Sequence, residues 1–454
     1  MKRWAGVVLA AGRGARMKSG TPKVLHKVCG REMVTYPVAA LKGAGIGRVA
    51  VVVSPDGAEA VRGLFGESVE YVLQQEPRGT GDALLRASDL LRAQADHVLV
   101  LGADTPLVRA ETLQELSQRH LAGGSLVTLI SAVCDPRDGL GMVARDAAGR
   151  VSGVCEFQDL QPEAAAAPYE ANAGVYCFRA SWMWDNLQAV GPSPGGEVYL
   201  TSLVPMAASR PGGADAFLVR DPSEVMGVND RRHLAWAEAE ARNRVRDRWM
   251  LEGVTLVDPG STFLDASVVL GRDTVIQPNT MVLGASTIGE ACTIGPGTVI
   301  RDSSIGDGSR VVASFVEEAT IEGSVEVGPF SHLRPGAYLE TGVHLGNFVE
   351  VKESRLERGV AAGHFSYIGD ASIGAGANLG AGMVTCNYDG VEKHRTVVGE
   401  GAFIGCDTML VAPVSVGPGA VTGAGAVVTR DVPPGRLAVG VPARMVESKR
   451  SHST

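Results

Sequence analysis

The C-terminal half of the chain carries a six-residue hydrophobic repeat. It begins as seven apolar residues spaced six apart, namely Leu264, Leu270, Ile276, Val282, Ile288, Ile294 and Ile300. The repeat resumes over residues 327–351 and again over residues 398–428. An amphipathic helix needs apolar residues three and four apart, so this spacing indicates a parallel β-helix instead. We expect three six-residue units per coil, with each apolar side chain stacked on its equivalent in the next coil.

Glycine often follows the apolar position of this repeat. The clearest examples are Gly289, Gly295, Gly328, Gly369, Gly405 and Gly417. We expect these glycines because coil corners require a positive φ, which glycine adopts without steric cost. The chain has 58 glycines and only 5% aromatic residues, a composition that suits a narrow, corner-rich coil.

The N-terminal half has a different pattern, in which short apolar runs alternate with amphipathic segments. Predicted strands lie at residues 4–11, 49–53, 69–73 and 98–101, and predicted helices lie at residues 57–64 and 80–91. This alternation predicts a parallel α/β sheet. Residues 230–251 contain neither Pro nor Gly and predict a long linking helix. We therefore expect domains at residues 1–229 and 252–454, joined by that helix.

Two features of the N-terminal half suggest phosphate chemistry. After the first predicted strand, small residues around Gly12 would let backbone N–H groups approach an anion, while Arg16 and Lys23 could neutralise its charge. Taken alone, this loop is equally consistent with an ordinary tight turn. Asp104 follows a later strand, at the sheet edge where ligands bind. On its own it could be a Mg²⁺ ligand or the cap of a following helix.

Charge and cysteine usage narrow the class of protein. The net charge is −8 and no long basic run is present, which argues against nucleic acid as a partner. The seven cysteines are scattered and form no CxxC pair, so we expect reduced thiols in a cytoplasmic protein. We expect no signal peptide, because residues 5–11 run straight into a glycine loop. We expect no membrane span, because no apolar run is long enough.

The motifs of the N-terminal half together resemble those of sugar-phosphate nucleotidyltransferases. They comprise Leu9-Ala10-Ala11-Gly12-x-Gly14-x-Arg16-Met17, Pro22-Lys23, Gln74, Gly79-Thr80-Gly81, Gly141, Glu156, Asn172 and Asn229. Joined to the six-residue repeat, they make nearly the whole chain resemble the family of bifunctional bacterial enzymes that produce UDP-N-acetylglucosamine. The resemblance implies uridylyl transfer from UTP to N-acetylglucosamine-1-phosphate, with release of pyrophosphate.

The same resemblance implies a role for each matched residue. Asp104 and Asn229 would bind Mg²⁺, while Arg16 and Lys23 would act catalytically by offsetting charge on the phosphates. Contacts to the nucleotide or sugar are implied for Leu9, Ala10, Ala11, Gly12, Lys23, Gln74, Gly79, Thr80, Gly141, Glu156, Asn172 and Asn229.

Polar residues interrupt the repeat in the C-terminal half. Arg334 and Lys352 lie 18 residues apart, which is one coil, so we expect a stacked basic pair suited to a phosphate. Without an anion, two such cations would repel each other. The repeat also lapses over residues 383–396, so this segment should project from the coils as a loop of functional importance.

These segments resemble the acetyltransferase half of the same family, which implies a left-handed β-helix and a homotrimer with active sites where subunits meet. His364 would be the general base that takes a proton from the amine of glucosamine-1-phosphate, which then attacks acetyl-CoA. Contacts to the sugar phosphate are implied for Arg334, Lys352, Tyr367 and Asn378. Contacts to acetyl-CoA are implied for Ala381, Asn387, Tyr388, Cys406 and Ala424. Cys406 departs from the family's usual Ser.

Two other interpretations of the sequence stay open. In one, the chain is a nucleotidyltransferase for another sugar and the β-helix only drives oligomerisation. A scaffold needs no set such as His364, Arg334 and Lys352, which argues against this interpretation. In the other, the chain is a non-catalytic trimeric scaffold that binds a ligand. The presence of Asp104 together with Lys23 argues against that.

Overall fold

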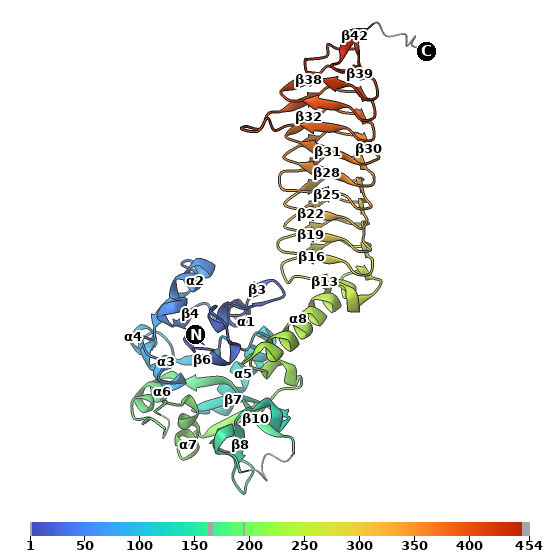
Figure 1. Ribbon diagram of the computed structural model, residues 1–454. Coiled ribbons are helices and arrows are strands. Elements are labelled where there is room, and N and C mark those ends of the chain that lie inside the picture. The colour runs from blue at the N-terminus through green and yellow to red at the C-terminus, as the bar shows by residue number, and fades with distance from the viewer. Residues whose placement is uncertain (1, 162–166, 194–195, 447–454) are drawn as a thin grey trace. The chain divides into compact units, whose positions relative to one another are not determined.

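The computed structural model describes residues 2–161, 167–193 and 196–446 (Figure 1). The chain divides into two compact units, Met1–Ala241 and Arg242–Thr454, here called the N-terminal unit and the β-helix unit. Helix α8 (Arg231–Leu251) runs across the division, where the sequence predicts a linking helix. Among the helices of the described residues, none is long and apolar enough to cross a membrane.

The N-terminal unit is built on one mixed sheet, with strand order β11-β7-β10-β6-β1-β4-β5 over the described residues. The strands are β1 (Trp4–Ala10), β4 (Val49–Val53), β5 (Glu70–Leu73), β6 (His97–Gly102), β7 (Val127–Cys134), β10 (Tyr169–Arg179) and β11 (Ala214–Leu218). Strand β1 pairs in parallel with β4 and β6, but β10 runs antiparallel to β6 and β7. The prediction of a parallel sheet is therefore wrong for β10. A parallel neighbour needs a crossover connection, whereas β8 (Met142–Arg145) and β9 (Val151–Cys155) form an antiparallel pair before β10.

Side chains of the central strands alternate between two hydrophobic cores. Leu99 and Leu101 of β6 belong to one core, whereas Val98 and Val100 belong to the other. The helices are α1 (Thr35–Gly43), α2 (Pro55–Phe65), α3 (Thr80–Arg86), α4 (Ser88–Leu91), α5 (Ala110–Gly123), α6 (Ala180–Leu187) and α7 (Leu203–Ala208). Burial on both faces explains why these strands form continuous apolar runs. The predicted helix at 80–91 is interrupted at Ala87, which separates α3 from α4.

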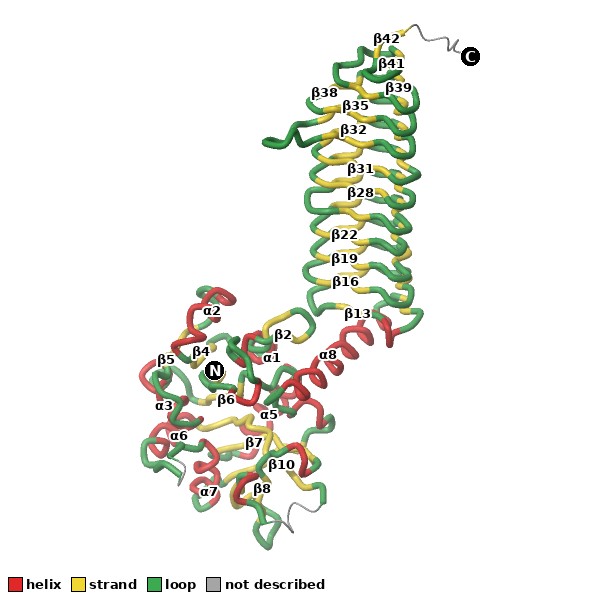
Figure 2. The backbone as a smooth tube through the Cα atoms, viewed as in Figure 1, coloured by secondary structure: helices red, strands yellow, loops and turns green. Residues whose placement is uncertain are grey.

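The β-helix unit consists of short strands stacked in three sheets along the described residues (Figure 2). They pair in parallel except at the end, where β42 (Arg444–Val446) runs antiparallel to β41 (Leu437–Val439). Each sheet takes every third strand, as in β15 (Val275–Ile276), which pairs with β18 (Thr293–Ile294) 18 residues later. Three six-residue units therefore make one coil, which confirms the predicted left-handed parallel β-helix. The inward apolar residues form one continuous core from Leu256 to Ala438.

Two of the sheets carry the residues of interest. One contains β25 (His332–Leu333), β28 (Val349–Lys352), β31 (Ser366–Gly369) and β34 (Val384–Cys386). The other contains β30 (Ala361–Ala362), β33 (Asn378–Leu379), β36 (Phe403–Ile404) and β39 (Val421–Thr422). Between β34 and β35 (Thr396–Val398), a loop extends from the side of the coils, as the lapse in the repeat predicts (Figure 2).

Most of the repeat glycines are needed for a reason other than the one predicted. Only Gly295 and Gly328 of the six have a positive φ. At Gly289 an added Cβ would lie 2.2 Å from Asp307 of the next coil, and at Gly405 it would lie 2.6 Å from the carbonyl oxygen of Thr422. Close approach between coils, rather than backbone conformation, therefore excludes larger residues there. Several corners with positive φ are occupied by other residues, such as Phe330 and Asp370.

Candidate active sites

A cavity of about 710 Å³ opens at the carboxyl ends of β1 and β6 in the N-terminal unit. The predicted residues that line it are Leu9, Ala11, Gly12, Arg16, Lys23, Gln74, Gly79, Thr80, Asp104, Gly141, Glu156, Asn172 and Asn229. These residues lie far apart in the sequence, between positions 9 and 229, and the fold brings them together around one space. Ala10 is the exception: it is only 5% exposed and packs in a hydrophobic core rather than lining the cavity.

Lys23 forms hydrogen bonds with both predicted metal ligands. Its Nζ donates to Asp104 Oδ2 at 2.6 Å and to Asn229 Oδ1 at 2.9 Å, and Arg16 also donates to Asn229 Oδ1 at 2.9 Å. The Lys23 side chain is only 11% exposed. Gly14 makes room for it, because a Cβ on this residue, at φ +62°, would lie 2.5 Å from Lys23 Cβ. Two cations and two oxygen ligands thus converge at one end of the cavity.

Asp104 does not cap the following helix. Helix α5 begins at Ala110, its N-cap is Arg109, and no side chain caps it. The helix-cap interpretation of Asp104 is therefore wrong. Instead, the backbone carbonyl of Asp104 accepts a hydrogen bond from the N–H of Val228 at 2.8 Å, which holds the segment of Asn229 beside it.

The oxygens of Asp104 and Asn229 suit a small, hard cation. One carboxylate and one amide oxygen are the kind of partial ligand set that Mg²⁺ uses when waters and phosphates complete its shell. Among the described residues, no group of three or more His, Cys, Asp or Glu side chains is placed to hold a metal ion. Two protein oxygens leave most of the coordination shell of such a cation to waters and phosphate oxygens.

Gln74 is fixed at the other end of the cavity. It is 4% exposed, and its Nε2 donates to Asp82 Oδ2 at 2.7 Å and to the carbonyl oxygen of Gly79 at 3.2 Å. Both partners are acceptors, so both N–H groups are used and Oε1 is left as an acceptor. Burial favours a higher pKa for Asp82, but hydrogen bonds from Gln74 and Arg86 outweigh this and the pKa lies below its ordinary value.

The remaining polar residues of the cavity are also held by hydrogen bonds. Glu156 Oε1 accepts from the hydroxyl of Thr201, and Asn172 Nδ2 donates to the hydroxyl of Tyr176 at 2.7 Å. The backbone N–H of Asn172 donates to the carbonyl of Gly141 at 2.7 Å. Burial raises the pKa of Tyr176 above its ordinary value, so its hydroxyl stays protonated and can accept from Asn172. This end of the cavity is a polar, pre-arranged surface.

His364 heads a column of residues on the β-helix. The register between β30 and β33 places it one coil from Ala381, and β36 and β39 continue the column through Cys406 to Ala424. Backbone hydrogen bonds join the coils at this corner, including one of 2.8 Å from Gly425 to the carbonyl of Cys406. His364, Cys406 and Ala424 are exposed. A histidine therefore stands at the end of a track of small side chains, about 4.8 Å apart per coil.

The predicted basic pair lies at the far end of β25 and β28. The register confirms that Arg334 and Lys352 are stacked, since Leu333 pairs with Val351. Arg334 also forms an ion pair of 2.8 Å with Glu350, so a carboxylate of the protein already balances one of the two charges. Lys352 is instead beside a third cation, Lys393 of the projecting loop, whose charge and hydrogen bond lower the pKa of Lys352.

The projecting loop is held against this basic cluster. Asn387 is 8% exposed, and its Nδ2 donates to Asp370 and, at 3.4 Å, to the hydroxyl of Tyr367. Asp389 accepts hydrogen bonds from the backbone of residues 391 and 392 and contacts His394 Nε2 at 2.7 Å. These bonds hold the pKa of Asp389 well below its ordinary value. Tyr388 is 60% exposed at the surface of the loop.

Tyr367 and Asn378 complete the predicted set. Tyr367 lies on the outer face of β31, one coil from Glu350. Asn378 begins β33 and sits one coil from Ala361. The sheet of β25, β28 and β31 thus carries His364 at one end and the basic cluster at the other.

Comparison with known proteins matches both halves. Residues 6–152 match the MobA-like NTP transferase domain, and residues 267–302 and 395–430 match the bacterial transferase hexapeptide of six repeats. The bifunctional protein GlmU of Pelobacter propionicus is 44% identical over 443 residues, which cover 97% of this chain and 96% of that protein. GlmU of Trichlorobacter lovleyi is 44% identical over 439 residues, covering 96% and 95%, and that of Heliobacterium modesticaldum is 44% identical over 440 residues, covering 97% and 96%.

The chain belongs to the GlmU family. As a GlmU-family protein it is a bifunctional transferase, with a nucleotidyltransferase half for uridylyl transfer and a hexapeptide-repeat half for acetyl transfer. The two constellations described above lie one in each half.

Sequence reasoning missed three residues of these GlmU-family sites. Lys393 lies in the segment where the repeat lapses, so its distance from Lys352 in three dimensions could not be read from the spacing. Glu350 stands two residues before Lys352, and nothing in that spacing shows that its carboxylate contacts Arg334 of the neighbouring coil. Asp82 falls in the first turn of α3, and its position eight residues after Gln74 gives no sign of contact.

Proposed function

We propose that the cavity of the N-terminal unit transfers a uridylyl group from UTP to N-acetylglucosamine-1-phosphate. The phosphate oxygen of the sugar phosphate attacks the α-phosphorus of UTP in line, and pyrophosphate leaves. Reactions of this class need positioning and charge stabilisation rather than covalent chemistry from the protein. The contacts of Lys23 with Asp104 and Asn229 are the observation that supports this most directly.

Each end of the cavity has its own task in this proposal. Gln74 accepts a hydrogen bond from the uracil ring, and the polar surface around Glu156 and Asn172 receives the sugar. Lys23 and Arg16 offset negative charge that develops on the phosphates between them. Asp104 and Asn229 would hold Mg²⁺, which when bound neutralises phosphate charge and polarises the P–O bond.

We propose that the β-helix unit acetylates glucosamine-1-phosphate with acetyl-CoA. His364 takes the proton from the sugar amine, which attacks the thioester carbonyl and releases the coenzyme A thiol. Arg334, Lys352 and Lys393 hold the sugar phosphate at the opposite end of the sheet. The track of Ala381, Cys406 and Ala424 gives acetyl-CoA a path along the coils without bulky side chains.

A trimer is supported by an aromatic ladder beside His364. Phe330, Phe348 and Phe365 occupy equivalent corners of three successive coils and are 59%, 60% and 55% exposed in the single chain. The rings of Phe330 and Phe348 stack with centroids 5.4 Å apart. Such a column of exposed apolar side chains is typical of a surface that another chain covers. In a homotrimer built on this ladder, His364 would lie at the subunit interface.

The absence of disulfides among the seven cysteines supports a cytoplasmic location.

The experiment follows pyrophosphate and free coenzyme A thiol together, with glucosamine-1-phosphate, acetyl-CoA, UTP and Mg²⁺ supplied. We expect wild type to release both, Asp104→Ala to release only thiol, and His364→Ala to release neither unless N-acetylglucosamine-1-phosphate is added. Asp89→Ala and His344→Ala, both at exposed positions, are the matched controls. Thiol release that survives His364→Ala would contradict the assignment of the base.

A further inference from the structure

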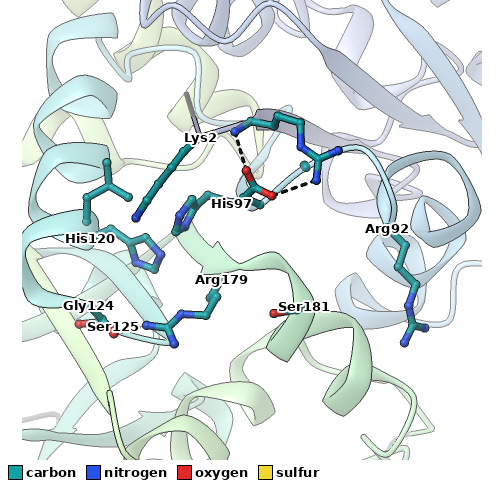
Figure 3. Close-up of a pocket in the computed structure, with 12 residues that line it drawn as sticks. Lys2, Arg92, His97, His120, Gly124, Ser125, Arg179 and Ser181 are labelled. Carbon is teal, nitrogen blue, oxygen red and sulfur yellow. Dashed lines mark hydrogen bonds and ion pairs between the residues drawn. The ribbon is translucent and has the colours of Figure 1, made fainter.

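A second cavity, of about 430 Å³, lies in the N-terminal unit at the opposite edge of the sheet (Figure 3). It opens at the amino ends of β1 and β6, where Trp4 pairs with His97. The proposed nucleotide cavity opens at the carboxyl ends of the same strands. About six residues of extended chain, roughly 20 Å, therefore separate the two cavities. No step of the proposed reactions uses the second one.

Its lining is strongly basic. Among the described residues, Lys2, Arg3, Arg92 and Arg179 face one carboxylate, Asp96. Asp96 is already occupied, because Arg3 donates to its Oδ1 at 3.0 Å and the Arg3 backbone donates to its Oδ2 at 2.8 Å.

The positive charge of two of these residues has no carboxylate partner. Arg92 forms an ion pair with Asp185, but no carboxylate of the described residues forms such a pair with Lys2 or Arg179. Arg179 donates to the backbone carbonyl of Gly124, which is neutral. Two cations thus converge on a concave site without compensation, an arrangement that favours an anion.

Two buried histidines form the floor of the cavity. His97 and His120 are 7% and 1% exposed, their rings meet edge to face with centroids 5.2 Å apart, and Figure 3 shows them close to Lys2 and Arg179. His97 Nδ1 and His120 Nε2 have no hydrogen-bond partner, which is costly for buried polar atoms. Burial, together with the charges of Lys2 and Arg179, lowers the pKa of His120 to about 3 and that of His97 below its ordinary value. Lys2 and Arg179 act to lower both pKa values, whereas Asp96 acts on His97 in the opposite direction.

We propose that this cavity is an anion-binding site, distinct from both active sites, for a phosphate group that Lys2 and Arg179 hold above His97. Ser125 and Ser181 line the same space and supply hydroxyl donors. Free phosphate and the phosphate of a small ester share this chemistry, and the volume accepts either. The proposal is independent of the identity of the sugar or nucleotide bound at the other edge.

Equilibrium dialysis of the full-length protein with radiolabelled inorganic phosphate tests this, at constant ionic strength set with chloride. We expect wild type to bind one more phosphate per chain than Lys2→Gln/Arg179→Gln, while Lys42→Gln, an exposed control, behaves as wild type. Lys2→Gln alone should weaken the additional site about tenfold or more, and because Lys2 is exposed this change leaves the core intact. Equal numbers of sites in wild type and both variants would overturn the proposal.

Two further experiments identify the source of the phosphate and test the anion site separately from the proposed uridylyl transfer. Displacement of label by glycerol 3-phosphate, but not by glycerol, assigns the site to phosphate esters, whereas displacement only by unlabelled phosphate assigns it to the free ion. Pyrophosphate release from UTP should persist in Lys2→Gln/Arg179→Gln. A variant that lost the additional site but kept this release would separate the anion site from the nucleotide cavity.

Discussion

The carboxylate of Asp82 accepts a hydrogen bond of 2.7 Å from the side-chain amide of Gln74. Arg86 holds the other oxygen of Asp82 at 2.7 Å, so the carboxylate is itself fixed. Because Asp82 and the Gly79 carbonyl use both N–H groups, Gln74 can offer only an acceptor to a ligand. Uracil presents an N3–H donor at that edge, whereas cytosine presents an acceptor.

Asp82→Ala is therefore expected to relax the choice of base. Without Asp82 the amide of Gln74 can turn and offer a donor, so kcat/KM for UTP should fall about 10- to 100-fold and the preference over CTP should narrow. Pyrophosphate release with each nucleotide measures this. Asp89→Ala is the control, and an unchanged UTP-to-CTP ratio in Asp82→Ala would show that Asp82 does not orient Gln74.

Lys23→Met should slow uridylyl transfer by about 10²–10³ in kcat. The ammonium contacts Asp104 as well as Asn229, and the second cation at this end of the cavity, Arg16, contacts Asn229. Steady-state pyrophosphate release measures the loss, and acetyl transfer serves as an internal control for folding. Lys27→Met, at the exposed end of β2 (Lys27–Val28), should retain wild-type activity. An equal loss of uridylyl transfer activity in Lys27→Met would contradict a specific role for Lys23, because removal of either positive charge would then have the same effect.

Lys393→Met should raise the KM for glucosamine-1-phosphate about tenfold and leave uridylyl transfer unchanged. The substitution removes one of the cations that converge on the proposed phosphate position, and with it a charge-assisted contact to the phosphate. Thiol release as a function of sugar phosphate measures the effect. Arg395→Met, on the same loop, is the matched control. A higher KM for acetyl-CoA alone would contradict this, because it would place Lys393 in the acetyl-CoA site.

His120 should make the stability of the N-terminal unit depend on pH. Its pKa of about 3 in the folded state is lower than that of an unfolded chain, so the unfolded state binds the extra proton below about pH 6.5. The stabilisation is present above that pH and is lost as the pH falls, with a slope approaching about 1.4 kcal/mol per pH unit.

Hydrogen exchange of β6 amides in the full-length protein, in buffer without phosphate, measures this stability between pH 4.5 and 6.5, a window set by the two pKa values of His120. In His120→Gln the slope should decrease by the contribution of one proton. The exposed His344→Gln should keep the wild-type slope. An unchanged slope in His120→Gln would mean that this side chain is not buried neutral.

Much of the architecture could be predicted because one spacing or alternation is repeated many times. The six-residue repeat specifies its own coil, and Val49–Val53 was bounded correctly because both of its faces are buried. The antiparallel β10 could not be foreseen, since direction depends on how the chain returns to the sheet. The role of Gly289 was misjudged for a related reason, because the atoms that exclude a side chain belong to the next coil.

The residues of the candidate sites also fall into two groups, those that a sequence motif marks and those that it does not. Residues that line the cavity stand in short motifs, so Lys23 and Asp104 could be named from the sequence. Residues that act through a neighbour, such as Asp82 behind Gln74, have no signature in spacing. The same holds for Lys393, which reaches Lys352 only because the loop folds back onto the coils.

The account rests on two chemistries carried by one chain, so the most direct measurement follows two labels into one product. The protein is supplied with glucosamine-1-phosphate, acetyl-CoA labelled with ¹⁴C in the acetyl group, UTP labelled with ³²P at the α-phosphate, and Mg²⁺. We predict a single UDP-sugar that contains both labels in equal amounts. A UDP-sugar that carries only ³²P, or one that forms only when N-acetylglucosamine-1-phosphate is supplied, would contradict the account.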